Sequence, residues 1–138
     1  MSAKKTVKPL VSVIKSSNSI SRALIKTPEI SNQNYGVCFQ LYEERFQHIT
    51  LKKLKPEELK SFNQLILEVI KCKTEAEFSQ FNRGKNNCGK KSKLNSHLLK
   101  NELIHIGKAR TTFRLHGVIL DKIFKIISID PKHEEHNS

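Results

Sequence analysis

A nearly continuous apolar run close to the C-terminus constrains the fold most. Residues 123–129 read Ile-Phe-Lys-Ile-Ile-Ser-Ile, and Pro131 ends the run. Side chains alternate between the two faces of a strand, so a run with so few polar residues must be covered on much of both faces. We therefore expect a central strand in a sheet. The chain has 138 residues, which suits one domain rather than two.

Two further strands are predicted just before this run. Residues 103–106 indicate one strand and residues 111–118 the next. In the second strand Phe113 and Leu115 point inward, whereas Arg114 and His116 point outward. A turn at residues 120–122 leads into the Ile-rich strand. The C-terminal part is therefore expected to be an antiparallel β-meander.

Helical periodicity appears upstream of the meander. Pro56 opens a predicted helix over residues 57–71, whose apolar positions form a single stripe. Thr74 and Glu77 have capping-box spacing and begin a second, short helix. A strand is expected over residues 36–42, followed by an extended segment over residues 45–50. This order predicts an α+β fold: a small antiparallel sheet with one or two helices packed on one face.

The first 34 residues differ in composition from the rest. They are rich in Ser and basic residues, and Glu29 is their single acid. We expect residues 1–34 to form a mobile basic arm, with one short amphipathic helix as the alternative. Residues 35–138 are expected to form a single α+β domain with a basic loop at 82–93, which is rich in Gly, Asn and Lys.

Positive charge dominates the sequence and gathers in one stretch. The formal net charge is +12, and from Arg83 to Arg114 nine Lys or Arg residues accompany one acid, Glu102. Such a stretch is typical of phosphate neutralisation, and the alternative is a solvated loop. The residues predicted to bind nucleic acid are Arg83, Lys85, Lys90, Lys91, Lys93, Lys108 and Lys132.

Several classes of protein are disfavoured by the residues that are present. No apolar run approaches the roughly 20 residues of a membrane span, and residues 9–14 are too few for a secretory signal. Three widely spaced cysteines without a Cys-x-x-Cys pair favour reduced thiols in the cytoplasm. Neither a phosphate-binding loop nor paired metal ligands can be placed. We therefore expect no cofactor and no metal.

The candidate catalytic residues lie in the meander and just after it. They are Arg110, Arg114, His116 and His133. If the last two strands form a hairpin, the arginines lie toward the end from which His133 emerges. RNA cleavage needs a base for the 2′-hydroxyl proton, cations for the phosphorane and an acid for the leaving 5′-oxygen. Imidazole suits either proton role, and ordinary surface positions are the alternative reading.

Residues 113–117, Phe-Arg-Leu-His-Gly, and residues 126–133, Ile-Ile-Ser-Ile-Asp-Pro-Lys-His, carry a resemblance. They resemble the C-terminal hairpin of the RelE/ParE-like toxin superfamily. By this resemblance Arg114 matches the strand arginine that stabilises the scissile phosphate, and His133 matches the C-terminal acid of YoeB-like members. Glu134 stands where an aromatic residue often follows that histidine, and Glu102 is only a positional guess for the base.

The resemblance implies a small antiparallel sheet and a metal-independent endoribonuclease that cleaves mRNA on the ribosome. It also implies an acidic antitoxin as a protein partner. Two alternatives stay open: a basic nucleic-acid-binding module without catalysis, and a ParE-like toxin that inhibits gyrase.

Overall fold

The computed structural model describes residues 32–135. The predicted arm lies almost wholly outside the described residues. Residues 34–135 belong to one compact unit. Its strands are β1 (Gly36–Cys38), β2 (Asn82–Lys85), β3 (Ile104–Ile106), β4 (Arg114–Leu120) and β5 (Ile123–Asp130), and its helices are α1 (Pro56–Val69) and α2 (Glu75–Ser79). Short 3₁₀ helices occupy Glu44–Phe46, Leu51–Lys53, Lys93–Ser96 and Lys100–Glu102.

The strands form one five-stranded sheet in the order β1-β5-β4-β3-β2. The antiparallel meander β3-β4-β5 follows the prediction, and the α+β class is confirmed. The sheet is mixed rather than wholly antiparallel, since β1 pairs parallel to β5. A parallel pair requires a long crossover, and the chain between these strands is long enough to supply one.

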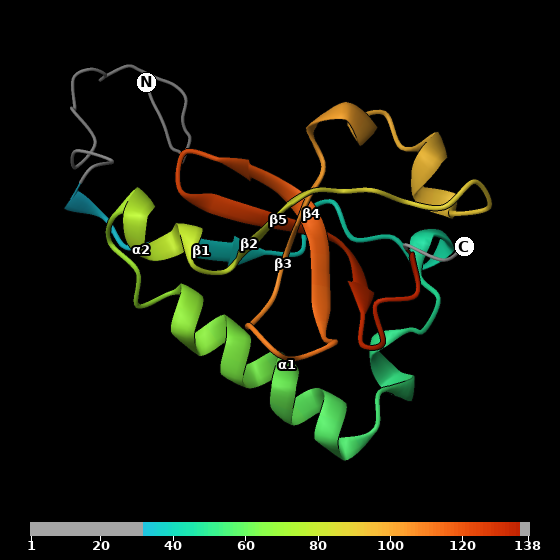
Figure 1. Ribbon diagram of the computed structural model, residues 1–138, viewed down its shortest axis with the longest axis horizontal. Helices are drawn as coiled ribbons and strands as arrows, with labels where there is room; N and C mark the ends of the chain where they lie inside the picture. Colours follow the sequence, from blue (N-terminus) through green and yellow to red (C-terminus); the bar gives the residue numbers. More distant parts are fainter. Residues whose placement is uncertain (1–31, 136–138) are drawn as a thin grey trace, which may run out of the picture. The chain divides into compact units, whose positions relative to one another are not determined.

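Helix α1 covers one face of the sheet (Figure 1). Its N-terminus is closed by Glu58, whose carboxylate accepts a hydrogen bond from the Lys55 backbone N–H at 2.9 Å. From the predicted stripe, Leu65 and Val69 are buried in a core that also contains Leu115. The second predicted helix is present as α2, with the Thr74–Glu77 capping box formed. Both helices therefore form where the apolar stripe and the capping box predict them.

The opposite face of the sheet is also covered, as the apolar run predicts. Val118 and Ile127 pack there against Leu94 and Leu103, which come from the segment that follows β2. Beyond the short β1, the outer edge of β5 is closed by the buried Gln47 amide. This amide donates to the Ile127 carbonyl at 2.7 Å and accepts from the Ile129 N–H at 2.9 Å.

Four local predictions are wrong. The first strand ends at Cys38 instead of residue 42, and residues 45 and 46 of the predicted extended segment lie in a 3₁₀ helix. The basic loop begins as strand β2, because its backbone pairs with β3 in spite of its Gly and Asn content. His116 faces away from α1 as predicted, but it is 2% exposed instead of facing solvent. Among the described residues, no helix is long and apolar enough to cross a membrane.

Gly117 allows β4 and β5 to approach at a bulge next to His116. A Cβ at this position would overlap the Lys125 carbonyl oxygen and lie 2.9 Å from the Phe124 ring. We expect Gly117→Ala to lower the free energy of unfolding by about 2 kcal/mol or more, because backbone must move. In the matched control Gly36→Ala, the added Cβ makes only an ordinary contact at 3.8 Å, so the free energy of unfolding should change little. Equal urea midpoints for the two variants would contradict this account.

Candidate active site

A polar pocket of about 280 Å³ lies on the sheet face opposite α1. It is lined by Arg83, Lys85, Asn86, Asn87, His105, His116 and His133. These residues come from β2 and the segment after it, from β3, from β4 and from the turn that follows β5. Four parts of the chain that are distant in sequence therefore meet at one place.

Strand register brings the histidines together. His105 on β3 is directly opposite His116 on β4, so the two rings lie on the same face of the sheet. Their centroids are 5.7 Å apart, with an interplanar angle of 24°. His133 lies on the other side of His105, with centroids 5.5 Å apart and an angle of 30°. The three rings form a stack with His105 in the middle.

His116 is fixed from both sides of its ring. Nε2 lies 3.2 Å from Asp130 Oδ2, and Nδ1 contacts Asn86 Oδ1. The Asn86 amide also donates to Cys88 Sγ at 2.6 Å. His116 and Asp130 are both fully buried. Both ring nitrogens are therefore engaged by side-chain oxygens. His116 is therefore held in one orientation.

The Asp130 carboxylate also closes the turn that carries His133. Oδ1 accepts from the Glu134 N–H at 2.7 Å, and Oδ2 accepts from the Glu135 N–H at 2.9 Å. His133 within this turn has φ 59°, which is uncommon for a residue other than Gly. Such strained backbone persists where its surroundings enforce it and is frequent at functional sites. The turn thus presents His133 at the pocket.

The end of the turn is anchored to the segment after β2. The buried Glu135 carboxylate accepts a hydrogen bond from Ser92 Oγ and lies 3.2 Å from His48 Nε2. The Gly89 N–H donates to the Glu135 carbonyl at 2.9 Å. These contacts join both sides of the pocket, so its shape depends on the C-terminal turn.

Two pKa values of the site are displaced. Burial lowers the pKa of His105 to about 4, with further contributions from His116, His133 and Arg114. His105 is therefore neutral at pH 7. Burial alone would raise the pKa of Asp130, but hydrogen bonds from His116 and from the backbone N–H groups of Glu135 and Glu134 outweigh it, and that pKa lies below its usual value.

The predicted Arg114 lies beside the pocket without lining it. Its Nη1 donates to the backbone carbonyls of Thr111 at 2.7 Å and Phe113 at 2.8 Å. The side chain passes over Gly107, where a Cβ would come within 2.8 Å of Arg114 Cδ. Burial and the nearby Arg83 lower the pKa of Arg114. In this arrangement the cations that line the pocket are Arg83 and Lys85 instead.

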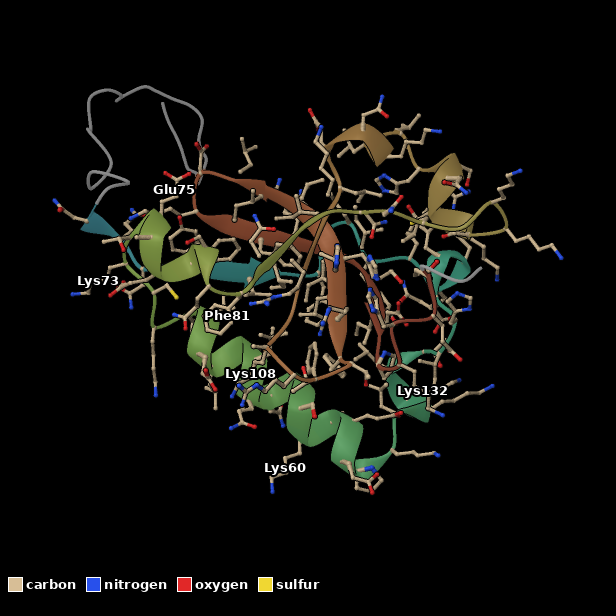
Figure 2. All side chains as sticks on the ribbon, in the orientation of Figure 1. Lys60, Lys73, Glu75, Phe81, Lys108 and Lys132 are labelled. Atoms are coloured by element: carbon tan, nitrogen blue, oxygen red, sulfur yellow. The ribbon has the colours of Figure 1, made fainter. Side chains whose placement is uncertain are left out.

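Other predicted site residues lie elsewhere. Lys108 forms an ion pair with Glu68 of α1 at 2.7 Å, and Figure 2 shows it beside that helix. Arg110 is exposed in the turn before β4, with φ 66°. Lys132 is exposed next to the site, and the exposed Lys90, Lys91 and Lys93 belong to the segment after β2. Of the four predicted catalytic residues, His116 and His133 meet in the pocket.

Sequence reasoning missed His105, Asn86, Asn87 and Asp130. An acidic residue at the end of an Ile-rich strand is a detectable anomaly, because burial of a carboxylate requires partners. His105 required the strand register, which places it opposite His116. Burial raises the pKa of the Cys88 thiol, so it is a poor nucleophile at neutral pH. Among residues 32–135, no group of three or more His, Cys, Asp or Glu side chains is arranged to hold a metal ion.

Comparison with known proteins gives no relative. Neither a protein-family model nor a curated protein nor a solved structure matches this chain. The likeness to the RelE/ParE-like superfamily thus rests on residues 113–133.

The Asp130 carboxylate gives a testable pH dependence. Its pKa is lower in the folded protein than in the unfolded chain, so its stabilisation is present above about pH 4 and is lost as pH falls through the folded value. Asp130→Asn should lower the free energy of unfolding at pH 7 by about 3 kcal/mol, since it breaks a buried pair. It should also reduce the loss of stability below pH 4.

Asp121→Asn is the matched control, because Asp121 is exposed in the β4–β5 turn. Urea unfolding between pH 2.5 and 7 compares the two variants. Indistinguishable curves would show that the Asp130 carboxylate does not hold the site together.

Proposed function

We propose that this chain is an endoribonuclease whose active site is the three-histidine pocket. The observation that carries the proposal is the convergence of His105, His116 and His133 with Arg83 and Lys85 around one pocket. The ring centroids of His133 and His116 lie 5.5 and 5.7 Å from that of His105. Proton donors and acceptors therefore lie within reach of a single phosphate. This constellation has the parts that phosphate-ester cleavage requires.

In the proposed cleavage step, two of the three rings move protons. Neutral His105 accepts the proton of the RNA 2′-hydroxyl, and the 2′-oxygen attacks the adjacent phosphorus. His133 gives a proton to the 5′-oxygen as the P–O5′ bond breaks. The products are a 2′,3′-cyclic phosphate and a 5′-hydroxyl. Arg83 and Lys85 stabilise the negative charge that develops on the phosphorane. His116 holds the stack in place from its buried pair with Asp130.

More broadly, we propose that the chain is a toxin of the RelE/YoeB type. It would act in the cytoplasm on mRNA at the ribosome, without a metal, and an acidic antitoxin would neutralise it. The net charge of +12 supports a polyanionic partner. The exposed lysines after β2 lie on the same segment as Asn86 and Asn87, so RNA held by these lysines would extend into the pocket.

Removal of the stacked histidines tests catalysis directly. We expect His105→Gln and His133→Gln each to reduce cleavage of a synthetic RNA by about 10²- to 10⁴-fold, the usual contribution of a general acid or base. Induced expression of the wild type should arrest growth and create new mRNA 5′ ends within translated frames. The control His97→Gln changes a histidine that packs on Phe46 outside the pocket and should keep full activity.

Three results would redirect the assignment. Full activity in folded His105→Gln and His133→Gln would remove the pocket from catalysis. Tight RNA binding with no cleavage by the wild type would favour the non-catalytic module. Arrest with intact mRNA and broken DNA would favour gyrase inhibition.

The exposed lysines should contribute to binding more than to chemistry. Replacing Lys90, Lys91 and Lys93 together with Gln should reduce the slope of log K against log salt for RNA by about 2–3, because each phosphate contact contributes about 0.7–0.9. The cleavage rate at saturating RNA should change little. A control that replaces the exposed Lys52, Lys53 and Lys60 should keep the wild-type slope. An unchanged slope in the first variant would mean that this segment does not contact RNA.

A further inference from the structure

Among residues 32–135, the side chains that line the pocket include cations and no carboxylate. Arg83 and Lys85 line it, and Arg114 is near enough to lower the pKa of His105. The Asp130 carboxylate, which contacts the pocket residue His116, is occupied by that ring and two backbone N–H groups. The space between the histidine rings and the β2 cations therefore has an uncompensated positive potential, which favours an anion.

Hydrogen-bonding capacity around the pocket is also unused. His105 Nδ1 and Arg114 Nε are buried, and neither has a hydrogen-bond partner in the described part of the chain. Buried polar atoms of folded proteins are nearly always bonded, so two such atoms on neighbouring strands indicate a place where a ligand changes the local arrangement. The Asn86 side chain at the same pocket is already bonded to His116 and Cys88.

We propose that the pocket binds a tetrahedral oxyanion, chemically a phosphate or sulfate group, and that the bound anion makes neutral His105 a stronger proton acceptor. This inference deepens the proposed function, since the physiological anion would be the RNA phosphate. It names a regulation of the site: the phosphate itself prepares the proton acceptor.

The coupling follows from the groups that face His105. His116 and Arg114 from β4 and His133 from the C-terminal turn oppose a proton on His105, whereas a hydrogen bond to the Lys85 backbone favours it. The side chains of Arg83 and Lys85 from β2 line the same pocket. A bound anion offsets this repulsion and raises the pKa of His105. By linkage, the protonated ring then strengthens anion binding by the same factor.

This coupling has a consequence for catalysis. A histidine with a pKa of about 4 is a weak base at neutral pH. A base is most effective when its pKa lies near the working pH. An RNA phosphate in the pocket would move His105 toward that range, so the strongest base would exist only in the substrate complex.

Sulfate is a suitable probe, because it keeps its double charge between pH 4 and 8. The experiment follows the ring Cε1–H resonance of His105 in the full chain by NMR, with the residue assigned through the backbone, from pH 7.5 to pH 4. We expect saturating sulfate to raise the pKa of His105 from about 4 to about 5 or above. Chloride that supplies the same total negative charge should change the pKa of His105 much less.

Two double variants, each lacking two positive charges, show where the anion binds. Arg83→Gln with Lys85→Gln should weaken sulfate binding about tenfold or more. The control Lys60→Gln with Lys73→Gln removes the same charge at exposed positions by α1 and α2 (Figure 2) and should leave binding unchanged. Equal binding by both variants, or an unchanged His105 pKa at saturating sulfate, would mean an adventitious ion only and would overturn the inference.

The outcomes separate this inference from the proposed function. A raised His105 pKa in a protein that does not cleave RNA would leave the anion site standing and remove the endoribonuclease. RNA cleavage with no sulfate-linked change in the pKa of His105 would leave the endoribonuclease standing and remove the anion-coupled proton acceptor.

Discussion

The Asp130 carboxylate lies at the end of β5 and joins that strand to two other parts that the candidate site needs, β4 and the C-terminal turn. It bonds His116 on β4 and the two backbone N–H groups that close the C-terminal turn. Glu135, the last residue of that turn, then reaches Ser92 and His48. A buried charge is costly unless it is fully paired, so this network is stable only when its parts are assembled together. The pocket and the folded C-terminal turn are therefore one cooperative unit.

The two-sided sheet explains why such a network can be buried at all. The α1 side supplies most of the apolar core, with residues such as Leu65 and Leu115. The second face needs only a small cluster around Leu94 and Ile127 to exclude water over part of the sheet. The remaining part of this face is free for polar side chains from neighbouring strands. The stability of the fold and the chemistry of the site thus occupy opposite faces of the same strands.

The sequence allowed the strongly periodic elements to be predicted. Helix α1, the capping box of α2 and the meander follow from local patterns, because each pattern reflects one buried face. The site was predicted less completely. His133 was found through its position after β5, but His105 joins it through a strand pairing that no local pattern encodes. Arg114 looked like a free cation, but the structure shows its guanidinium bonded to the nearby backbone carbonyls of Thr111 and Phe113, three and one residues before it.

The position of Arg114 changes how the charge of the site should be understood. An arginine whose Nη1 is held by backbone carbonyls cannot move far toward a ligand, yet its charge still acts on His105 through space. Arg83 and Lys85, on the edge strand β2, line the pocket, and the Arg83 guanidinium also donates to the backbone carbonyls of Gln80 and Phe81. One cation held beside the pocket and two cations that line it all favour the entry of an anion. His105 lies among them, where the arrival of negative charge favours a proton on its ring.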